Sequence, residues 1–203
     1  MALMKSISGI RGTIGGKPGD NLTPVDIIKF TAAYGTILGK GKKVIVGRDG
    51  RMSGEMVRSL VVNTLTGLGL DVIDLGLSTT PTVEMAVKFE GAAGGIILTA
   101  SHNPKQWNAL KLLNEKGEFI SAELGLQMLA IAESEQFDFA QVDELGTYSC
   151  DDTLLQTHID AILVHPLVNK KQIAEKKFKV VVDAINSSGA EAVPALLTAL
   201  GVT

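Results

Sequence analysis

The side chains that could do chemistry in this chain gather where one short apolar run ends. Residues 96–98 are Ile-Ile-Leu after two glycines, and they give way at once to Thr-Ala-Ser-His-Asn-Pro at positions 99–104. Such a run predicts a buried strand, and the polar segment after it predicts a loop at the carboxyl end of that strand. Asn103-Pro104 favours a turn, because proline fixes its own φ and keeps the preceding residue out of the α region. Ligands of open α/β sheets bind at this edge, so Ser101 is the candidate for the reactive atom.

A serine hydroxyl needs an adjacent base or a metal before it becomes a good nucleophile. His102 places an imidazole next to Ser101 in the chain. Without further context, both residues are also explained as turn residues that hydrogen-bond to the backbone. Lys111, in a predicted returning strand over residues 108–113, is likewise explained as a charge on a strand edge.

A second polar segment follows the first predicted strand, which spans residues 3–8. It reads Ser-Gly-Ile-Arg-Gly at positions 8–12 and continues into a glycine-rich turn that ends at Gly19. The glycines lack the Gly-x-Gly-x-x-Gly spacing of dinucleotide-binding loops. Taken alone, these residues favour a hairpin with a solvated Arg11 over a phosphate-binding arginine.

A third polar segment, Gly-Arg-Asp-Gly-Arg at positions 47–51, follows a predicted buried strand over residues 43–47. Asp49 predicts an Asp-Gly turn, and Ser53 predicts the cap of the next helix. We interpret the segment as loop scaffolding to which its arginines add positive charge.

Strands and helices alternate along the first part of the chain. Thr23-Pro24 predicts a capped helix start, and an apolar stripe of Val25, Ile28, Ala32 and Leu38 predicts its buried face. Further strands are predicted at residues 70–75, 96–98 and 108–113, and further helices at about residues 54–68, 80–89 and 121–133. The alternation predicts an α/β protein with a three-layer α/β/α domain, in which a mostly parallel mixed sheet has helices on both faces.

The second part of the chain predicts an incomplete α/β domain. We place the boundary at about Thr147, which gives domains of residues 1–147 and 148–203. Helices are predicted after Asp152 and at about residues 190–200, with a strand at residues 178–182 between them. One strand and its helices cannot bury both faces of a sheet, so this domain is expected to be truncated, and self-association through it stays open.

Composition excludes several classes of protein. The net charge of −3 and an aromatic content of 4% do not suit a nucleic-acid-binding surface. A single cysteine, Cys150, rules out an internal disulfide and fits a reducing compartment. No apolar run approaches the roughly 18 residues of a membrane span, and the N-terminus lacks a signal-peptide core.

His158 and His165 lie seven apart without a third ligand, so they are predicted to be ordinary surface residues. We therefore expect a cytoplasmic protein with no membrane or nucleic-acid partner.

The segment at positions 99–104, followed by Trp107-Asn108 and Lys111, resembles the phosphoserine loop of the α-D-phosphohexomutases, the phosphoglucomutase/phosphomannomutase family. Ile-Arg-Gly at positions 10–12 and Gly-Arg-Asp-x-Arg at positions 47–51 keep the order found in that family. The resemblance covers the first domain and the start of the second. It implies a serine that carries a phosphoryl group and exchanges it with a hexose phosphate, interconverting the 1-phosphate and 6-phosphate of glucose or mannose through a bisphosphate.

The resemblance also implies roles for individual residues. Ser101 would be the phosphoserine, with a charge of about −1.5 to −2 that needs cations nearby. His102, Arg11 and Lys111 would supply these, and Lys111 would act as general acid/base or contact the phosphate. Ala109 departs from the glycine usual in the family. The further substrate- or phosphate-loop residues are Thr99, Asn103, Asn108 and Arg48. The implied cofactors are Mg²⁺, held partly by the phosphate on Ser101, and a bisphosphorylated hexose as activator.

The family's Asp-x-Asp-x-Asp-Arg metal loop is absent from this sequence. We therefore expect the 203-residue chain alone to be inactive. Two other functions are compatible with the serine loop. One is a non-catalytic sugar-phosphate-binding or regulatory phosphoprotein module, which would turn over nothing. The other is a phosphatase with Ser101 as transient phosphoryl acceptor, which would release phosphate stoichiometrically.

Overall fold

The computed structural model describes residues 3–6 and 9–203. Its described strands form one sheet in the order β1-β2-β6-β5-β3-β4-β7. Their bounds are β1 Met4–Ser6, β2 Gly9–Thr13, β3 Lys43–Arg48, β4 Asp71–Leu77, β5 Gly94–Leu98, β6 Trp107–Leu113 and β7 Tyr148–Cys150. The pairs β3–β4, β3–β5 and β4–β7 are parallel, whereas β1–β2, β2–β6 and β5–β6 are antiparallel. Residues 7 and 8 of the first predicted strand lie outside the described residues.

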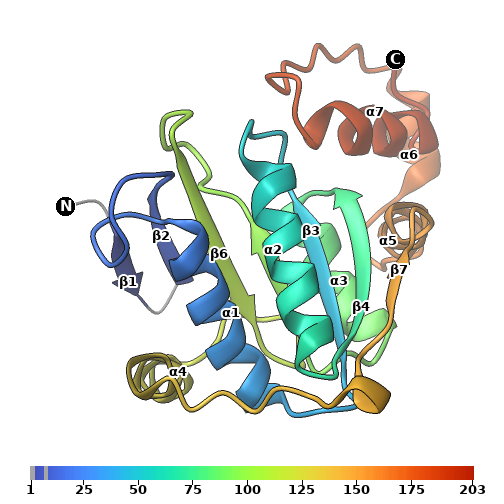
Figure 1. Cartoon of the computed structure of the whole chain (residues 1–203). Coiled ribbons are helices and arrows are strands. Elements are labelled where there is room, and N and C mark those ends of the chain that lie inside the picture. Colours follow the sequence, from blue (N-terminus) through green and yellow to red (C-terminus); the bar gives the residue numbers. More distant parts are fainter. Residues whose placement is uncertain (1–2, 7–8) are drawn as a thin grey trace.

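Helices cover both faces of the sheet (Figure 1). Their bounds are α1 Pro24–Leu38, α2 Gly54–Gly67, α3 Thr80–Phe89, α4 Ala122–Ser134, α5 Leu154–Leu163, α6 Lys170–Glu175 and α7 Gly189–Ala199, with a 3₁₀ turn at Val142–Glu144. One face packs against α1, α2 and α4, and the other packs against α3 and α5. The predicted three-layer α/β/α fold with a mixed sheet is therefore confirmed. The sheet is not mostly parallel, because three of its six strand pairings are antiparallel.

The central strands alternate between the two layers of core. Val44 and Val46 of β3 belong to the cluster beneath α1, α2 and α4, whereas Ile45 belongs to the cluster beneath α3. In β5, Ile97 likewise faces the α3 side. Each such buried side chain contributes about 1.5–3 kcal/mol. Burial on both faces explains why these strands are continuous apolar runs in the sequence.

The buried face of α1 differs from the predicted stripe. Val25 is 58% exposed and Ile28 is 39% exposed, while Ile27, Phe30 and Tyr34 are buried. The Tyr34 hydroxyl donates to the carbonyl of Leu113 at 2.6 Å, and its burial raises the Tyr34 pKa. Ala32 is buried and Leu38 packs against the core as predicted, so the prediction was wrong for Val25 and Ile28. It left out Phe30 and Tyr34, the two aromatic side chains that the helix turns towards the core.

The predicted helix starts have mixed outcomes. Thr23 caps α1 as expected, since its side chain accepts from the backbone N–H of Asp26. Ser53 precedes α2 but makes no capping hydrogen bond, so that prediction was wrong. Its hydroxyl instead accepts from Asn108 Nδ2 at 2.9 Å. A long-range partner from β6 therefore replaces the local one.

Two predictions for residues 151–203 were wrong. Residues 178–182 form no strand, and Val181 is fully exposed. Two backbone hydrogen bonds link this segment to the end of the chain. The Val180 N–H donates to the Thr203 carbonyl at 2.9 Å, and the Thr203 N–H donates to the Phe178 carbonyl at 3.2 Å. With no neighbouring strand among the described residues to cover them, these apolar side chains stay in solvent. The division at residue 147 stays a prediction, and β7 extends the sheet just past it.

His158 is the second correction, because it is not an ordinary surface residue. It is half-buried between α5 and α3, and its Nδ1 lies 3.1 Å from Thr82 Oγ1. This burial lowers the His158 pKa. His165, by contrast, is exposed as predicted.

None of the helices in the described part of the chain is long and apolar enough to cross a membrane.

Candidate active site

Ser101 stands in a strained position just beyond the carboxyl end of β5. Its φ of 53° lies in the left-handed region, which costs a non-glycine residue about 1–2 kcal/mol. The Ser101 side chain is exposed, and its Oγ lies 3.5 Å from His102 Nδ1. Strained residues of this kind persist only where the surrounding structure holds them, and they occur often at functional sites. The geometry therefore agrees with a reactive role for Ser101.

A cavity of about 250 Å³ opens beside Ser101. It brings together Arg11 from β2, Lys111 from β6 and the serine loop. Arg11 pairs with Ala109 in the antiparallel β2–β6 ladder. Because Ala109 and Lys111 are two residues apart on one strand, Arg11 and Lys111 project from the same face of the sheet. The full lining is Gly9, Arg11, Thr99, Ala100, Ser101, His102, Asn103, Ala109, Lys111 and Phe119.

The two cations in this cavity are held differently. Lys111 Nζ lies 5.8 Å from the centre of the Phe119 ring, within range of a cation–π contact. Arg11 Nε is buried and has no hydrogen-bond partner among the residues that the structure describes. A buried donor without a partner costs about 1–3 kcal/mol. Arg11 lines the cavity, so its positively charged guanidinium is suited to bind a phosphate there.

Gly9 also lines this cavity. Its φ is +117°, and a Cβ on this residue would lie 2.1 Å from the carbonyl oxygen of Leu110. Only glycine allows the β2 backbone to approach β6 so closely. Gly9, two positions before Arg11, therefore allows β2 to carry Arg11 into the cavity beside Lys111.

A second cavity, of about 300 Å³, lies on the other side of the serine loop. Asp49, Gly50, Arg51 and Lys105 line it together with residues 101–103, and Ile185 and Ser187 close it from the second part of the chain. The backbone N–H of Gly50 donates to Ser187 Oγ at 2.9 Å. Residues 101–103 therefore form a wall between two cavities.

Two of the sequence-predicted site residues do not line either cavity. Arg48 donates from Nη1 to the Asp49 carbonyl at 3.2 Å, and its Nη2 lies 3.3 Å from Glu55 Oε2. Asn108 is fully buried and donates to Ser53. Both residues stabilise segments next to the serine loop, and neither reaches the space beside Ser101. Thr99 and Asn103 do line the first cavity.

Sequence reasoning gave Arg51 no individual role, although its guanidinium contacts the serine loop most extensively. Its Nη2 donates to the Ser101 carbonyl at 2.7 Å. The only signal in the sequence was the repeated arginine of Gly-Arg-Asp-Gly-Arg, which does not say which arginine faces which loop.

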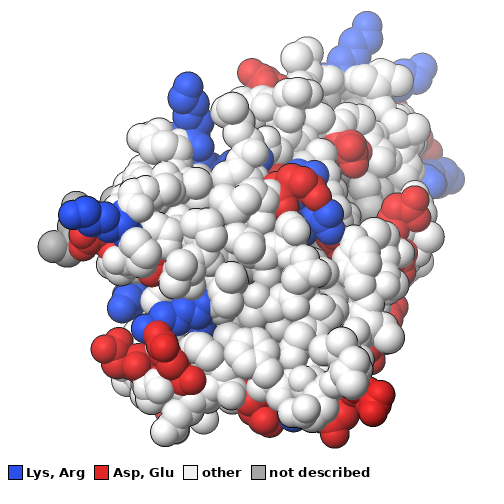
Figure 2. Space-filling view, in the orientation of Figure 1, with Lys and Arg blue, Asp and Glu red and all other residues white. Residues whose placement is uncertain are grey.

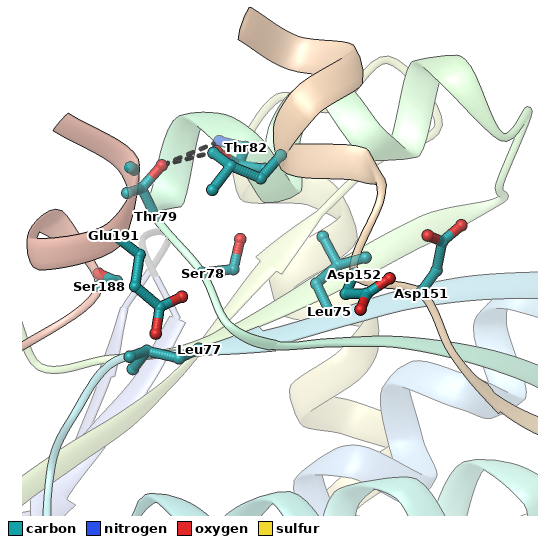
Figure 3. A pocket seen from close by; sticks show the side chains of 11 residues that line it. Leu75, Leu77, Ser78, Thr79, Thr82, Asp151, Asp152, Ser188 and Glu191 are labelled. Carbon is teal, nitrogen blue, oxygen red and sulfur yellow. Dashed lines mark hydrogen bonds between the residues drawn. The ribbon is translucent and has the colours of Figure 1, made fainter. Parts of the chain in front are cut away.

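A smaller cavity of about 70 Å³ lies between the end of β4, α3, α5 and α7 (Figure 3). Its ionisable lining groups are all carboxylates, from Asp151, Asp152 and Glu191. It contains none of the sequence-predicted site residues, and its charge would repel a sugar phosphate. On the face shown in Figure 2, acidic and basic side chains form small separate groups between wide uncharged areas.

The matching family model is that of phosphoglucomutase/phosphomannomutase, alpha/beta/alpha domain I, over residues 4–139. The phosphoglucosamine/phosphogalactosamine mutase of Sulfurisphaera tokodaii is 34% identical over 202 residues, which cover 99% of this chain and 43% of that protein. A phosphoglucomutase/phosphomannomutase of Thermococcus kodakarensis is 36% identical over 196 residues, covering 94% of this chain and 42% of that protein.

The solved structures agree with these relatives. A phosphoglucomutase/phosphomannomutase family protein from Burkholderia thailandensis superposes with a TM-score of 0.73 at 25% identity, covering 98% of this chain and 43% of that one. The chain thus spans less than half the length of the relatives that it matches. The match of family model, curated relatives and fold shows that the chain belongs to the phosphoglucomutase/phosphomannomutase family.

Proposed function

We propose that the chain supplies the phosphoryl-carrying part of a phosphohexomutase active site, which interconverts hexose 1-phosphate and hexose 6-phosphate. The observation that carries the proposal is the position of Ser101. It is exposed, strained and open to a cavity that also contains Arg11 and Lys111. Phosphoryl transfer depends mainly on positioning and on neutralising the charge of the phosphate, and these residues provide both.

In the proposed reaction a phosphoryl group on Ser101 moves to a free hydroxyl of the bound hexose phosphate. The bond from phosphorus to Ser101 Oγ breaks, and a bond from phosphorus to the sugar oxygen forms. The sugar hydroxyl loses a proton and Ser101 Oγ gains one, and His102 Nδ1, 3.5 Å from that oxygen, is placed to relay it. Arg11 and Lys111 offset the charge of the transferred group. The bisphosphate then turns round and returns its other phosphate to Ser101.

Magnesium was implied by the family resemblance. A phosphate on Ser101 would offer it oxygen ligands, which Mg²⁺ prefers. In the part of the chain that the structure describes, however, no group of three His, Cys, Asp or Glu side chains is placed to hold a metal ion. Asp49, the carboxylate beside the loop, is already paired with Arg51. The described residues do not make up a magnesium site, and no step above passes through the metal.

The names of the relatives support the proposed substrate class. Glucose and mannose phosphates were expected, and one relative is named for glucosamine and galactosamine phosphates. We propose a hexose or hexosamine phosphate, with a bisphosphorylated hexose as activator.

The test is an assay of the protein expressed from its complete reading frame. Glucose 1-phosphate, mannose 1-phosphate and glucosamine 1-phosphate are supplied in turn, with glucose 1,6-bisphosphate as activator. We expect isomerisation of at least one of them, a phosphate on Ser101 by mass spectrometry, and a loss on the order of 10⁶-fold in Ser101→Ala. Ser134→Ala, on α4, is the matched control and should keep full activity.

Other outcomes identify the alternatives. Stoichiometric release of free phosphate would favour a phosphatase, and binding without turnover would favour a regulatory module. We also propose that the 203-residue chain alone is inactive. Measurable isomerisation by that chain would contradict this part.

A further inference from the structure

Every hydrogen-bond donor of the Arg51 guanidinium is used within the protein. The group has five N–H donors. Nε donates to Asp49 Oδ2 at 3.1 Å. Nη1 donates to the carbonyls of Pro104 and Trp107, each at 2.9 Å, and Nη2 donates to those of Ser101 at 2.7 Å and Asn103 at 2.8 Å. One side chain therefore fixes four carbonyls across seven residues of the serine loop.

The same arginine closes a ring of contacts around the strained backbone of Ser101. The Ser101 N–H donates to Thr99 Oγ1 at 3.1 Å, and the Thr99 hydroxyl donates to Asp49 Oδ2 at 2.6 Å. That carboxylate oxygen also accepts from Arg51 Nε, and Arg51 Nη2 returns to the Ser101 carbonyl. Both backbone polar groups of Ser101 thus depend on one ion pair.

The Asp49–Arg51 pair lies mostly out of solvent, since the two side chains are 15% and 10% exposed. Charge-assisted hydrogen bonds are the stronger kind, and Arg51 makes five of them in a fixed planar geometry. No N–H of Arg51 is left for a substrate phosphate. A lysine has three donors on one nitrogen, so it cannot reach four separate carbonyls and Asp49 together.

We propose that Arg51 is a positioning residue for the reaction, which it serves by holding the Ser101 backbone at its left-handed conformation with Oγ directed outward. Asp49 orients Arg51 and, through Thr99, the Ser101 N–H. Arg51 acts through Ser101 and does not contact the substrate. This proposal rests on the proposed function, because a positioned nucleophile has a purpose only if Ser101 carries the phosphoryl group.

The test compares Arg51→Lys with Arg58→Lys in the protein expressed from its complete reading frame. Arg58 is a matched control, because it also pairs with an aspartate, Asp74, at 2.6 Å, but contacts no residue of the serine loop in any hydrogen bond that the structure describes. We expect Arg51→Lys to lower kcat by about 100-fold, as misplacement of a reacting group does, with KM changed less than about 3-fold. Arg58→Lys should keep kcat within about 3-fold of the wild type. A kcat within that range in Arg51→Lys, or a loss confined to KM, would overturn the proposal.

A second readout does not depend on activity. Hydrogen exchange followed by mass spectrometry should show faster exchange, by about 10-fold or more, in peptides covering residues 99–107 of Arg51→Lys and unchanged exchange there in Arg58→Lys. If the wild type has no mutase activity, the proposed function fails and exchange alone decides whether Arg51 holds the loop. If Arg51→Lys does not fold, Asp49→Asn replaces it, because the amide keeps the shape of Asp49 but loses its charge and cannot accept from Thr99, Arg51 Nε and the Arg51 backbone N–H together. Unchanged exchange in residues 99–107 of the folded variant would refute the proposal.

Discussion

Two arginines lie on opposite sides of Ser101, and the protein uses them in opposite ways. Arg51 lines the second cavity with all five donors taken up by the serine loop and Asp49. Arg11 lines the first cavity with a buried Nε that has no partner among the described residues. A side chain whose donors are all used stabilises the fold, whereas a cation that lines a cavity can stabilise an anionic ligand there. Arg48 Nε is also buried without a partner among the described residues, but Arg48 lines neither cavity, so the position of Arg11 on the first cavity is what indicates binding.

The largest effect expected from this comparison concerns Arg11. Arg11→Met removes a cation that faces the transferred phosphate, and we expect kcat/KM to fall by about 10²- to 10³-fold. The free energy of unfolding, measured by urea denaturation, should change by less than about 1 kcal/mol, because no described partner is lost. A variant that loses stability and keeps activity would reverse the assignment of the two arginines.

Arg51→Met should show a larger loss of stability. Removing one partner of a largely buried pair leaves Asp49 and four loop carbonyls without their donor, and we expect unfolding to become easier by about 3 kcal/mol. Urea denaturation of this variant beside Arg11→Met measures the difference directly. Equal stabilities would mean that the full set of donors on Arg51 has no energetic value.

Tyr34→Phe extends the comparison to a neutral group that lines none of the cavities described above. The fully buried hydroxyl donates to Leu113 and lies 3.3 Å from the Gly95 carbonyl, so its loss leaves buried carbonyls short of a donor. We expect a cost of about 1–2 kcal/mol in thermal or urea unfolding and no change in kcat. A change in kcat would show that the packing of α1 on β5 and β6 affects the conformation of the serine loop.

The smallest effect concerns His158, whose described side-chain hydrogen bond is the one to Thr82. Burial lowers its pKa in the folded protein below the ordinary value of 6.5, so the unfolded chain binds the proton more readily. The stability that this histidine contributes is fully present above about pH 6.5 and is lost as the pH falls through the folded pKa. Urea unfolding at pH 7.5 and pH 5 should therefore show a smaller pH dependence in His158→Gln than in the wild type. The exposed His165→Gln is the control and should behave like the wild type.

Local sequence signals predicted most of the elements correctly. The Thr23-Pro24 start of α1 and the apolar run of β5 were predicted from capping geometry, proline and β-branched residues, all of which act within a few positions. Predictions were less accurate where the structure depends on a partner that is distant in the sequence. Ser53 was predicted as a cap and accepts instead from Asn108, which lies 55 positions away in the chain.

The candidate site also has features that local sequence predicts and features that depend on distant residues. The sequence by itself determined that a serine, a histidine and a turn would follow a buried strand, because the order of residues around position 101 is enough for that. The face of α1 that is buried, the exposed backbone at residues 178–182, the convergence of Arg11 and Lys111, and the five contacts of Arg51 were decided by the tertiary structure. These depend on strand register and on which polar groups compete for each donor, and such long-range pairings leave no periodic signal in a single sequence.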